Sequence, residues 1–199
     1  LPLYTSLLSP SQYGIVDIVS TYVQILIPIF FLQIDQSGFR YLIEAGDDAW
    51  ARTRIITNVI GVIVAQIVIM LVSFAIVMLY VEIDYCVYLL ATVIVTAFST
   101  TMLQVTRGLK QSRLYASGSF LTGALSIVLN VLLITVLNMG TEGILLSNIC
   151  ANLACILYLA ARLKIHNYIR LELLDKKLIK KLLKYSLPLV PNAIFLWII

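Results

Sequence analysis

The sequence predicts an all-α, polytopic transmembrane helix bundle, and its composition, the placement of its charges and the length of its apolar runs each point to this fold class. Of the 199 residues, 61% are hydrophobic and 12% are charged, with a mean hydropathy of +0.99. Soluble domains are about 45–50% apolar and about 25% charged. This chain lacks the polar residues that would cover a soluble surface. The composition therefore excludes a soluble enzyme, a disordered protein and a disulfide-stapled secreted domain.

Charge-free runs mark the individual spans. A spanning helix needs about 20 mostly apolar residues, whereas a barrel strand has about 10 residues of alternating character. Six runs fit helices: residues 18–34, 55–81, 85–106, 114–141, 143–161 and 185–199. We expect residues 1–162 to hold the end of one helix and five complete ones, and residues 185–199 to start another. Because both ends fall in apolar sequence, we expect a fragment cut at each end.

The Lys and Arg residues predict the orientation. All 14 lie in three alternate segments, residues 40–54, 107–113 and 162–184. In the loops between these segments, the only charged residues are acidic. The positive-inside rule makes the three basic segments cytoplasmic. Residues 163–184 combine apolar residues at helical spacing with many lysines, which predicts a cytoplasmic linker that forms a basic amphipathic helix on the inner membrane surface. A plain solvated linker and a role in gathering anionic lipid are the alternatives.

Polar residues inside the spans predict a cavity. At 100° per residue, the polar residues of the first span and its proline share one side, opposite Val19 and Val23. Polar groups in a membrane tend to face protein or water, although caps and helix–helix hydrogen bonds would also explain them. We also expect a kink at the proline and close helix packing through Ser126. We expect Asn58 to lie too near the inner interface to contribute to a cavity. The predicted cavity residues are Asp17, Thr21, Gln24, Pro28, Asn130, Asn148 and Asn152.

Enzymatic and metal-binding signatures are missing from the sequence. The three cysteines lie unpaired in apolar stretches, and a single histidine cannot build a metal centre, so we expect no metal and no cofactor. There is no P-loop and no carboxylate pair spaced for acid–base chemistry, so we expect no enzyme. An ion-coupled antiporter would need a carboxylate within a span, and the predicted spans contain none.

Four motifs resemble a known family in order and position. Residues 7–14 (LLSPSQYG) resemble the LLSPxxYG signature after the first helix of polysaccharide flippases, which belong to the multidrug/oligosaccharidyl-lipid/polysaccharide exporter superfamily. Residues 38–41 (GFRY) and 107–108 (RG) are similar to the basic turns after the second and fourth helices. Residues 182–191 (LLKYSLPLVP) resemble the entry into the seventh helix.

This resemblance implies two six-helix lobes around a central cavity, with this chain as most of the first lobe. Such proteins flip undecaprenyl-pyrophosphate-linked oligosaccharide across the bacterial plasma (inner) membrane by alternating access, for capsule, O-antigen or exopolysaccharide assembly. The implied partners are that substrate, membrane lipids and other polysaccharide-assembly proteins, with no nucleic acid. Arg40 and Arg107 at the cytoplasmic mouth are the candidates for the diphosphate, because Arg binds phosphate oxygens in pairs. A drug/cation antiporter and a membrane-bound polymerase or glycosyltransferase are the alternatives.

Overall fold

The computed structural model describes residues 9–80 and 85–198, which form helices and turns with no strand among them. Its elements are α2 (Pro10–Phe31), α3 (Ile34–Glu44), α4 (Ala49–Met78), α5 (Cys86–Gly108), α6 (Ser112–Val131), the π-helical turn η1 (Leu132–Val136), α7 (Gly140–Leu163), the 3-10 turns η2 (Ile165–Tyr168) and η3 (Leu171–Leu173), α8 (Lys176–Ser186) and α9 (Leu189–Ile198). Within the described part, five helices are long and apolar enough to cross a membrane. The prediction of an all-α polytopic bundle is confirmed.

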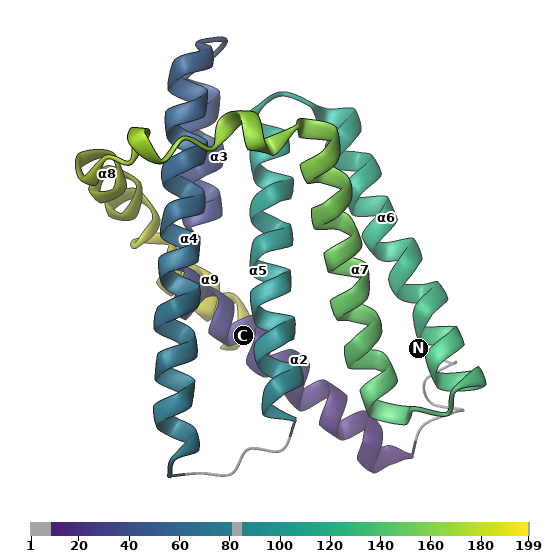
Figure 1. Cartoon of the computed structure of the whole chain (residues 1–199). Helices are drawn as coiled ribbons and strands as arrows, with labels where there is room; N and C mark the ends of the chain where they lie inside the picture. Colours follow the sequence, from purple (N-terminus) through teal and green to yellow (C-terminus); the bar gives the residue numbers. More distant parts are fainter. Residues whose placement is uncertain (1–8, 81–84, 199) are drawn as a thin grey trace.

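Figure 1 shows α4, α5, α7 and α6 standing side by side, while α2 runs obliquely across the lower part of the bundle. α3 lies beside α4, and the segment from η2 to α8 crosses the upper end. The most extensive contacts join α7 to α5 and α6, and α3 to α5. The predicted helix end at residues 1–8 and the acidic loop at residues 82–84 lie outside the described residues.

The start of α2 comes earlier than the first charge-free run predicts, because Ser9 caps the helix. Ser9 Oγ accepts the Gln12 N–H at 3.3 Å, and Gln12 Oε1 accepts the Ser9 N–H at 3.0 Å. This reciprocal capping box satisfies two backbone donors, and Pro10 fits the first helical position. The spanning helix therefore includes Asp17. The expectation that the spans hold no carboxylate is wrong for α2.

The break in the first span lies one turn beyond Pro28. Leu32 and Gln33 both adopt left-handed backbone angles, with φ of 50° and 54°, so the right-handed helix ends there. Pro28 still accepts the Leu32 N–H at 3.1 Å. Asp35 directly follows the first charge-free run and was expected at the end of that span. It lies instead in the first turn of α3. At 1.5 Å per residue, it is about 13 Å along the helix axis from Glu44 at the other end of α3.

The linker after α7 is helical over only half of its predicted length. The prediction of a single amphipathic helix over residues 163–184 is wrong for the first half, which forms η2 and η3. In the second half, α8 covers Lys176–Ser186. The span expected from residue 185 begins instead as α9 at Leu189. Pro188 accounts for the separation, because it has no backbone N–H to donate to a carbonyl of the preceding turn, whereas Leu187 keeps right-handed helical angles.

Buried side chains of α4 explain why the first half of the linker is not helical. Thr57 Oγ1 donates to the Tyr168 carbonyl at 2.8 Å, and Asn58 Nδ2 donates to the Leu173 carbonyl at 2.9 Å. These bonds give the linker backbone partners on another helix in place of its own. Asn58, which lies too near the basic end to contribute to a cavity in our prediction, is fully buried and anchors the linker.

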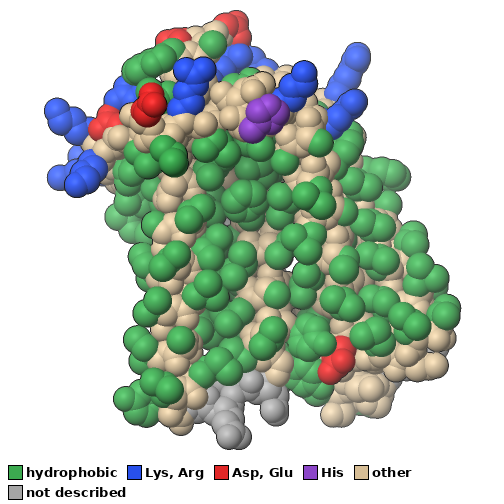
Figure 2. Space-filling view, in the orientation of Figure 1, with side chains coloured by type: hydrophobic (Ala, Val, Ile, Leu, Met, Phe, Trp, Pro, Cys, Tyr) green, Lys and Arg blue, Asp and Glu red, His purple; other side chains and the backbone are tan. Residues whose placement is uncertain are grey.

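Charge is segregated to one end of the bundle. Figure 2 shows the Lys and Arg side chains gathered at the end that holds the α3–α4 turn and the linker, above a broad apolar band. Large apolar side chains on the outward side of α4, such as Val68, Ile69 and Val72, are more than half exposed in this chain. An apolar belt beneath a basic end is typical of a protein that crosses a bilayer.

Candidate functional site

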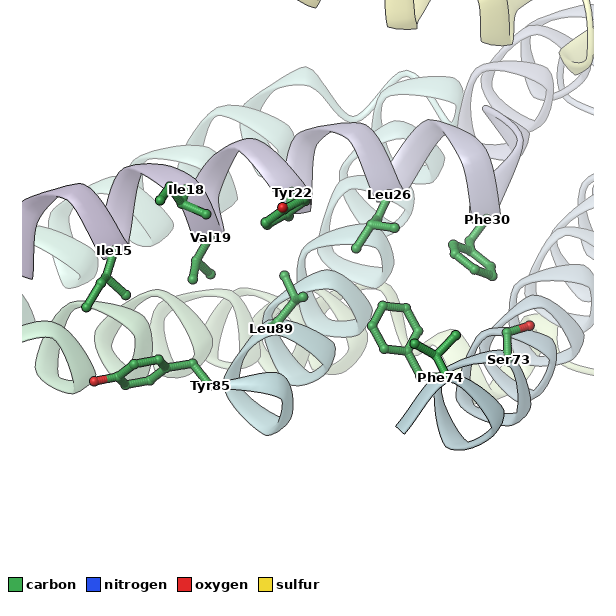
Figure 3. Close-up of a pocket in the computed structure, with 11 residues that line it drawn as sticks. Ile15, Ile18, Val19, Tyr22, Leu26, Phe30, Ser73, Phe74, Tyr85 and Leu89 are labelled. Carbon is green, nitrogen blue, oxygen red and sulfur yellow. The ribbon is translucent and has the colours of Figure 1, made fainter. Parts of the chain in front are cut away.

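The two sides of α2 face two different pockets. The apolar one has a volume of about 610 Å³ and lies between α2, α4 and α5. Figure 3 shows Leu26 and Phe30 of α2 pointing toward Phe74 and Leu89 across it. The rings of Phe30 and Phe74 have their centroids 6.2 Å apart. A lining of this kind favours the binding of a hydrocarbon group.

The second pocket, the polar cleft, has a volume of about 270 Å³ and lies between α2, α6 and α7. Its lining residues are Tyr13, Val16, Asp17, Ser20, Ser126, Asn130, Ile144 and Asn148. A carboxylate, two amides and three hydroxyls thus converge between these three helices. These groups offer both donors and acceptors to a polar ligand.

Contact between the starts of α2 and α7 places the polar cleft. Thr141 Oγ1 donates to the Gln12 carbonyl at 3.4 Å. Gly140 has a φ of +55°, and a Cβ there would lie 2.8 Å from Gln12 Nε2. Glycine therefore meets both the left-handed angle and the close approach. Asp17, five residues further along α2, is thereby brought to face α6 and α7.

Hydrogen bonds between α6 and α7 hold the far wall of the polar cleft. Ser126 Oγ donates to Asn148 Oδ1 at 3.1 Å. Ser147 Oγ contacts Asn130 Oδ1, and both of these side chains are buried. Ser126, expected to serve helix packing, therefore also orients an amide of the cleft. Interhelical bonds of this kind fix side chains within a membrane bundle.

Three of the predicted cavity residues, Asp17, Asn130 and Asn148, lie together in the polar cleft. The others do not line it. The Thr21 hydroxyl is exposed and donates to the Asp17 carbonyl at 2.9 Å, and Asn152 Nδ2 donates to the Asn148 carbonyl at 2.9 Å. Gln24 is half-buried and Pro28 is buried, and neither lines this cleft.

Tyr13 and Ser20 are lining residues that the sequence reasoning missed. They share a helical face with Asp17 at spacings of four and three residues. This shared face can be recognised in the sequence only if the helix is taken to begin at Pro10, so that it includes Tyr13. The Ser9–Gln12 capping pattern was the signal in the sequence that could have extended it.

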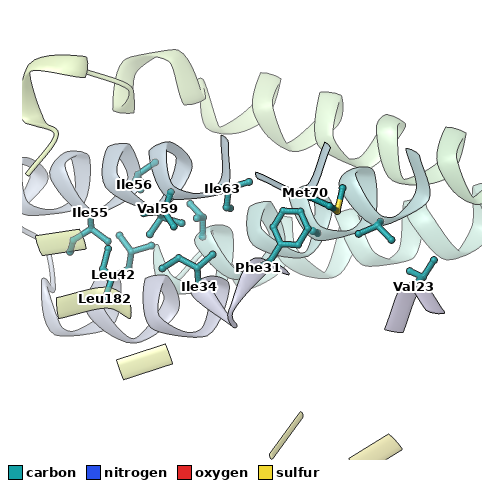
Figure 4. Close-up of a cluster of buried hydrophobic side chains, with 14 of the residues drawn as sticks. Val23, Phe31, Ile34, Leu42, Ile55, Ile56, Val59, Ile63, Met70 and Leu182 are labelled. Atoms are coloured by element: carbon teal, nitrogen blue, oxygen red, sulfur yellow. The ribbon is translucent and has the colours of Figure 1, made fainter. Parts of the chain in front are cut away.

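Packing of α3 against α4 positions the basic end. Figure 4 shows Ile34 and Leu42 of α3 beside Val59 of α4, with Leu182 of α8 close by. Leu42, Val59 and Leu182 are fully buried. Gly38 lets the two helices approach, because a Cβ there would lie 3.0 Å from a Val59 methyl. The far end of α3 is thus fixed beside α8.

Arg40 and Arg107 both lie exposed at this end and rest on aromatic rings. Arg40 Nε donates to Glu44 Oε1 at 2.8 Å, and its guanidinium carbon lies 4.4 Å from the centre of the Tyr185 ring. The Arg107 guanidinium carbon lies 4.6 Å from the centre of the Phe39 ring. Such cation–π contacts orient both guanidinium groups, and that of Arg40 is also paired with Glu44.

No cluster of three or more His, Cys, Asp or Glu side chains is placed to hold a metal ion in the described part of the chain. The polar cleft, where polar side chains of three helices converge, is the candidate functional site. A family model described as "Polysaccharide biosynthesis protein" matches residues 1–199. No curated protein and no solved structure matches the chain.

Proposed function

Because the chain belongs to the polysaccharide biosynthesis protein family, we propose that it forms part of a transporter that flips lipid-linked oligosaccharide across the bacterial plasma membrane. The observation that carries this proposal is the polar cleft, a hydrogen-bonding site inside a bundle of membrane-spanning helices. Polar groups at such positions are costly in a bilayer, and they mark substrate or ion pathways.

The lining of the polar cleft suits a glycan. Sugar hydroxyls donate and accept hydrogen bonds, and they match the amides of Asn130 and Asn148 and the carboxylate of Asp17. Undecaprenyl-pyrophosphate-linked oligosaccharide, the substrate class we propose, also carries a long hydrocarbon tail. The apolar pocket on the opposite side of α2 offers a hydrocarbon surface to such a tail.

The basic end suits the diphosphate. By the positive-inside rule, that end faces the cytoplasm, where lipid-linked precursors are presented. Arg40 and Arg107 stand there on aromatic rings, exposed to an approaching headgroup. Alternating access would then pass the glycan along the bundle toward the opposite end, for capsule, O-antigen or exopolysaccharide assembly.

Transport by the complete protein in proteoliposomes tests this proposal. The variant Asn148→Leu keeps the side-chain volume but removes the amide from the polar cleft. Loss of one hydrogen bond of about 1 kcal/mol should slow the flipping of a fluorescent lipid-linked oligosaccharide about fivefold. Thr21→Val is the matched control, because its hydroxyl lies on α2 outside the cleft. Equal rates in the two variants would contradict a substrate role for the cleft.

A drug/cation antiporter is the second candidate, and the position of Asp17 favours it. This carboxylate lies inside a spanning helix and faces the polar cleft, as an ion-coupling residue would. Drug efflux that is abolished by Asp17→Asn, in a protein that moves no lipid-linked oligosaccharide, would establish antiport instead of flipping.

A further inference from the structure

Helix α8 has one face packed into the bundle and one face left outward. Leu182 and Ser186 are buried, and α8 contacts both α3 and α4. On the outward face, Lys176, Lys180 and Lys184 alternate with apolar side chains around a groove of about 460 Å³. The apolar residues of the groove are Ile179, Leu183 and Leu187.

The attachment of α8 to α4 is specific, so its outward face has a fixed direction. Asn58 Oδ1 accepts the Asp175 N–H at 2.9 Å, directly before the first turn of the helix. The Asp175 carboxylate pairs with Arg54 and also accepts the Lys177 N–H at 2.8 Å. Gly61 leaves room for Leu174, whose methyl carbon would lie 2.9 Å from a Cβ at that position.

The lysines of the outward face form no ion pair with an acidic residue among those that the structure describes. In the described part of the chain, the ion pairs join Arg40 to Glu44, Arg52 to Asp47 and Arg54 to Asp175, and none of them involves a lysine of α8. Because Asp175 is already paired with Arg54, the nearest carboxylate along the chain does not offset these lysines. The face is therefore strongly cationic and apolar at the same time.

The position of the outward face of α8 matches the surface of a bilayer. The blue side chains at the left of Figure 2, over α8 as placed in Figure 1, lie at the upper edge of the apolar band. Leu187, half exposed at the end of the groove, directly precedes the residues that lead into the apolar helix α9. Lysine ammonium groups on long stems reach phosphates while neighbouring apolar side chains enter the acyl region.

We propose that the outward face of α8 binds the headgroups of anionic phospholipids in the leaflet at the basic end of the bundle. The three lysines contact the lipid phosphates, and Ile179, Leu183 and Leu187 contact the upper acyl chains. This binding site is separate from the polar cleft and does not depend on which substrate the protein carries. Anionic lipid would thereby hold α8 against the membrane surface.

Lipid binding by the complete purified protein tests the proposal. Native mass spectrometry measures the affinity for phosphatidylglycerol and for phosphatidylcholine. At roughly fivefold per lysine near an anionic surface, the triple variant K176Q/K180Q/K184Q should lose roughly 100-fold in phosphatidylglycerol affinity. Its phosphatidylcholine affinity should stay unchanged. K176R/K180R/K184R keeps the charge and should retain the binding.

A matched triple variant separates this face from bulk charge. R162Q/K164Q/R170Q removes the same charge from exposed residues at the same end of the bundle, outside α8. It should bind phosphatidylglycerol within about twofold of the parent if the lipid contacts α8 itself. Equal losses in the two neutralised triple variants, or no loss in K176Q/K180Q/K184Q, would overturn the proposal. Equal losses would assign the effect to bulk charge, and no loss would leave an acidic protein partner as the occupant.

Discussion

Asn58 joins α4 to the segment that leads into α8, and its replacement should release that segment locally. The side chain is fully buried. Nδ2 donates to the Leu173 carbonyl at 2.9 Å, and Oδ1 accepts the Asp175 N–H at 2.9 Å. Leucine is similar in size but makes neither bond. Asn58→Leu therefore leaves two backbone groups of the linker without their partners.

The magnitude follows from those two groups. A buried backbone group that loses its hydrogen bond costs about 1–3 kcal/mol, and groups that are only partly buried fall near the lower end. We expect the free energy of local opening of the linker to fall by about 2–3 kcal/mol in the Asn58→Leu variant. This corresponds to a population of the open form that is roughly 30 to 160 times larger.

Amide hydrogen exchange over residues 168–176, measured in the complete protein in nanodiscs, detects this opening. Exchange should accelerate by the same factor, because it reports the open population. Asn152→Leu is the control, since the Asn152 amide donates to a carbonyl of its own helix. If exchange of the linker is the same in both variants, Asn58 does not anchor it.

Three further predictions concern the basic end. Gly108→Ala should lower the free energy of unfolding by about 1–3 kcal/mol, measured by denaturant titration, because the new Cβ would lie 2.8 Å from Leu42 Cβ. The hydrogen bond from the Lys177 N–H, and to a lesser extent the Arg54 guanidinium, lower the pKa of Asp175 in the folded protein. The contribution of Asp175 to linker docking is therefore complete above the unfolded-state pKa of about 3.9. It is lost as the pH falls through the lowered pKa of the folded state. Pepsin cleavage of the linker should therefore rise below about pH 4, and Asp175→Asn should remove this dependence. Arg40→Lys should reduce surface glycan at unchanged protein abundance, because Lys cannot bind a diphosphate in a bidentate way; normal surface glycan would exclude that role.

Contacts between distant segments determine which of the predicted cavity residues line the polar cleft. Helical periodicity grouped Asp17, Thr21, Gln24 and Pro28 on one face, but only Asp17 lines the polar cleft. The reason is the oblique course of α2, which crosses α7 near its own first turns and then diverges from it (Figure 1). Helices that cross at an angle touch over a short stretch, so residues on one face need not share a neighbour.

The linker illustrates a second limit. Its lysines and leucines have a helical spacing throughout, yet residues 165–175 form 3-10 turns and extended backbone. Their hydrogen bonds go to Thr57 and Asn58, more than 100 residues earlier in the chain. No local pattern identifies such partners, because the amphipathic spacing is compatible with both outcomes.

The sequence by itself determined the fold class, the approximate spans and the gathering of every basic side chain at one end. These features follow from the cost of placing charges and unpaired backbone groups in hydrocarbon, a cost that each segment meets on its own. Only the tertiary structure decided where the first span breaks, which polar residues meet across helices, and how α8 is held. Those outcomes depend on contacts between distant segments, such as Gly140 against Gln12 and Asn58 against Leu173, and a local sequence pattern does not encode the geometry of such contacts.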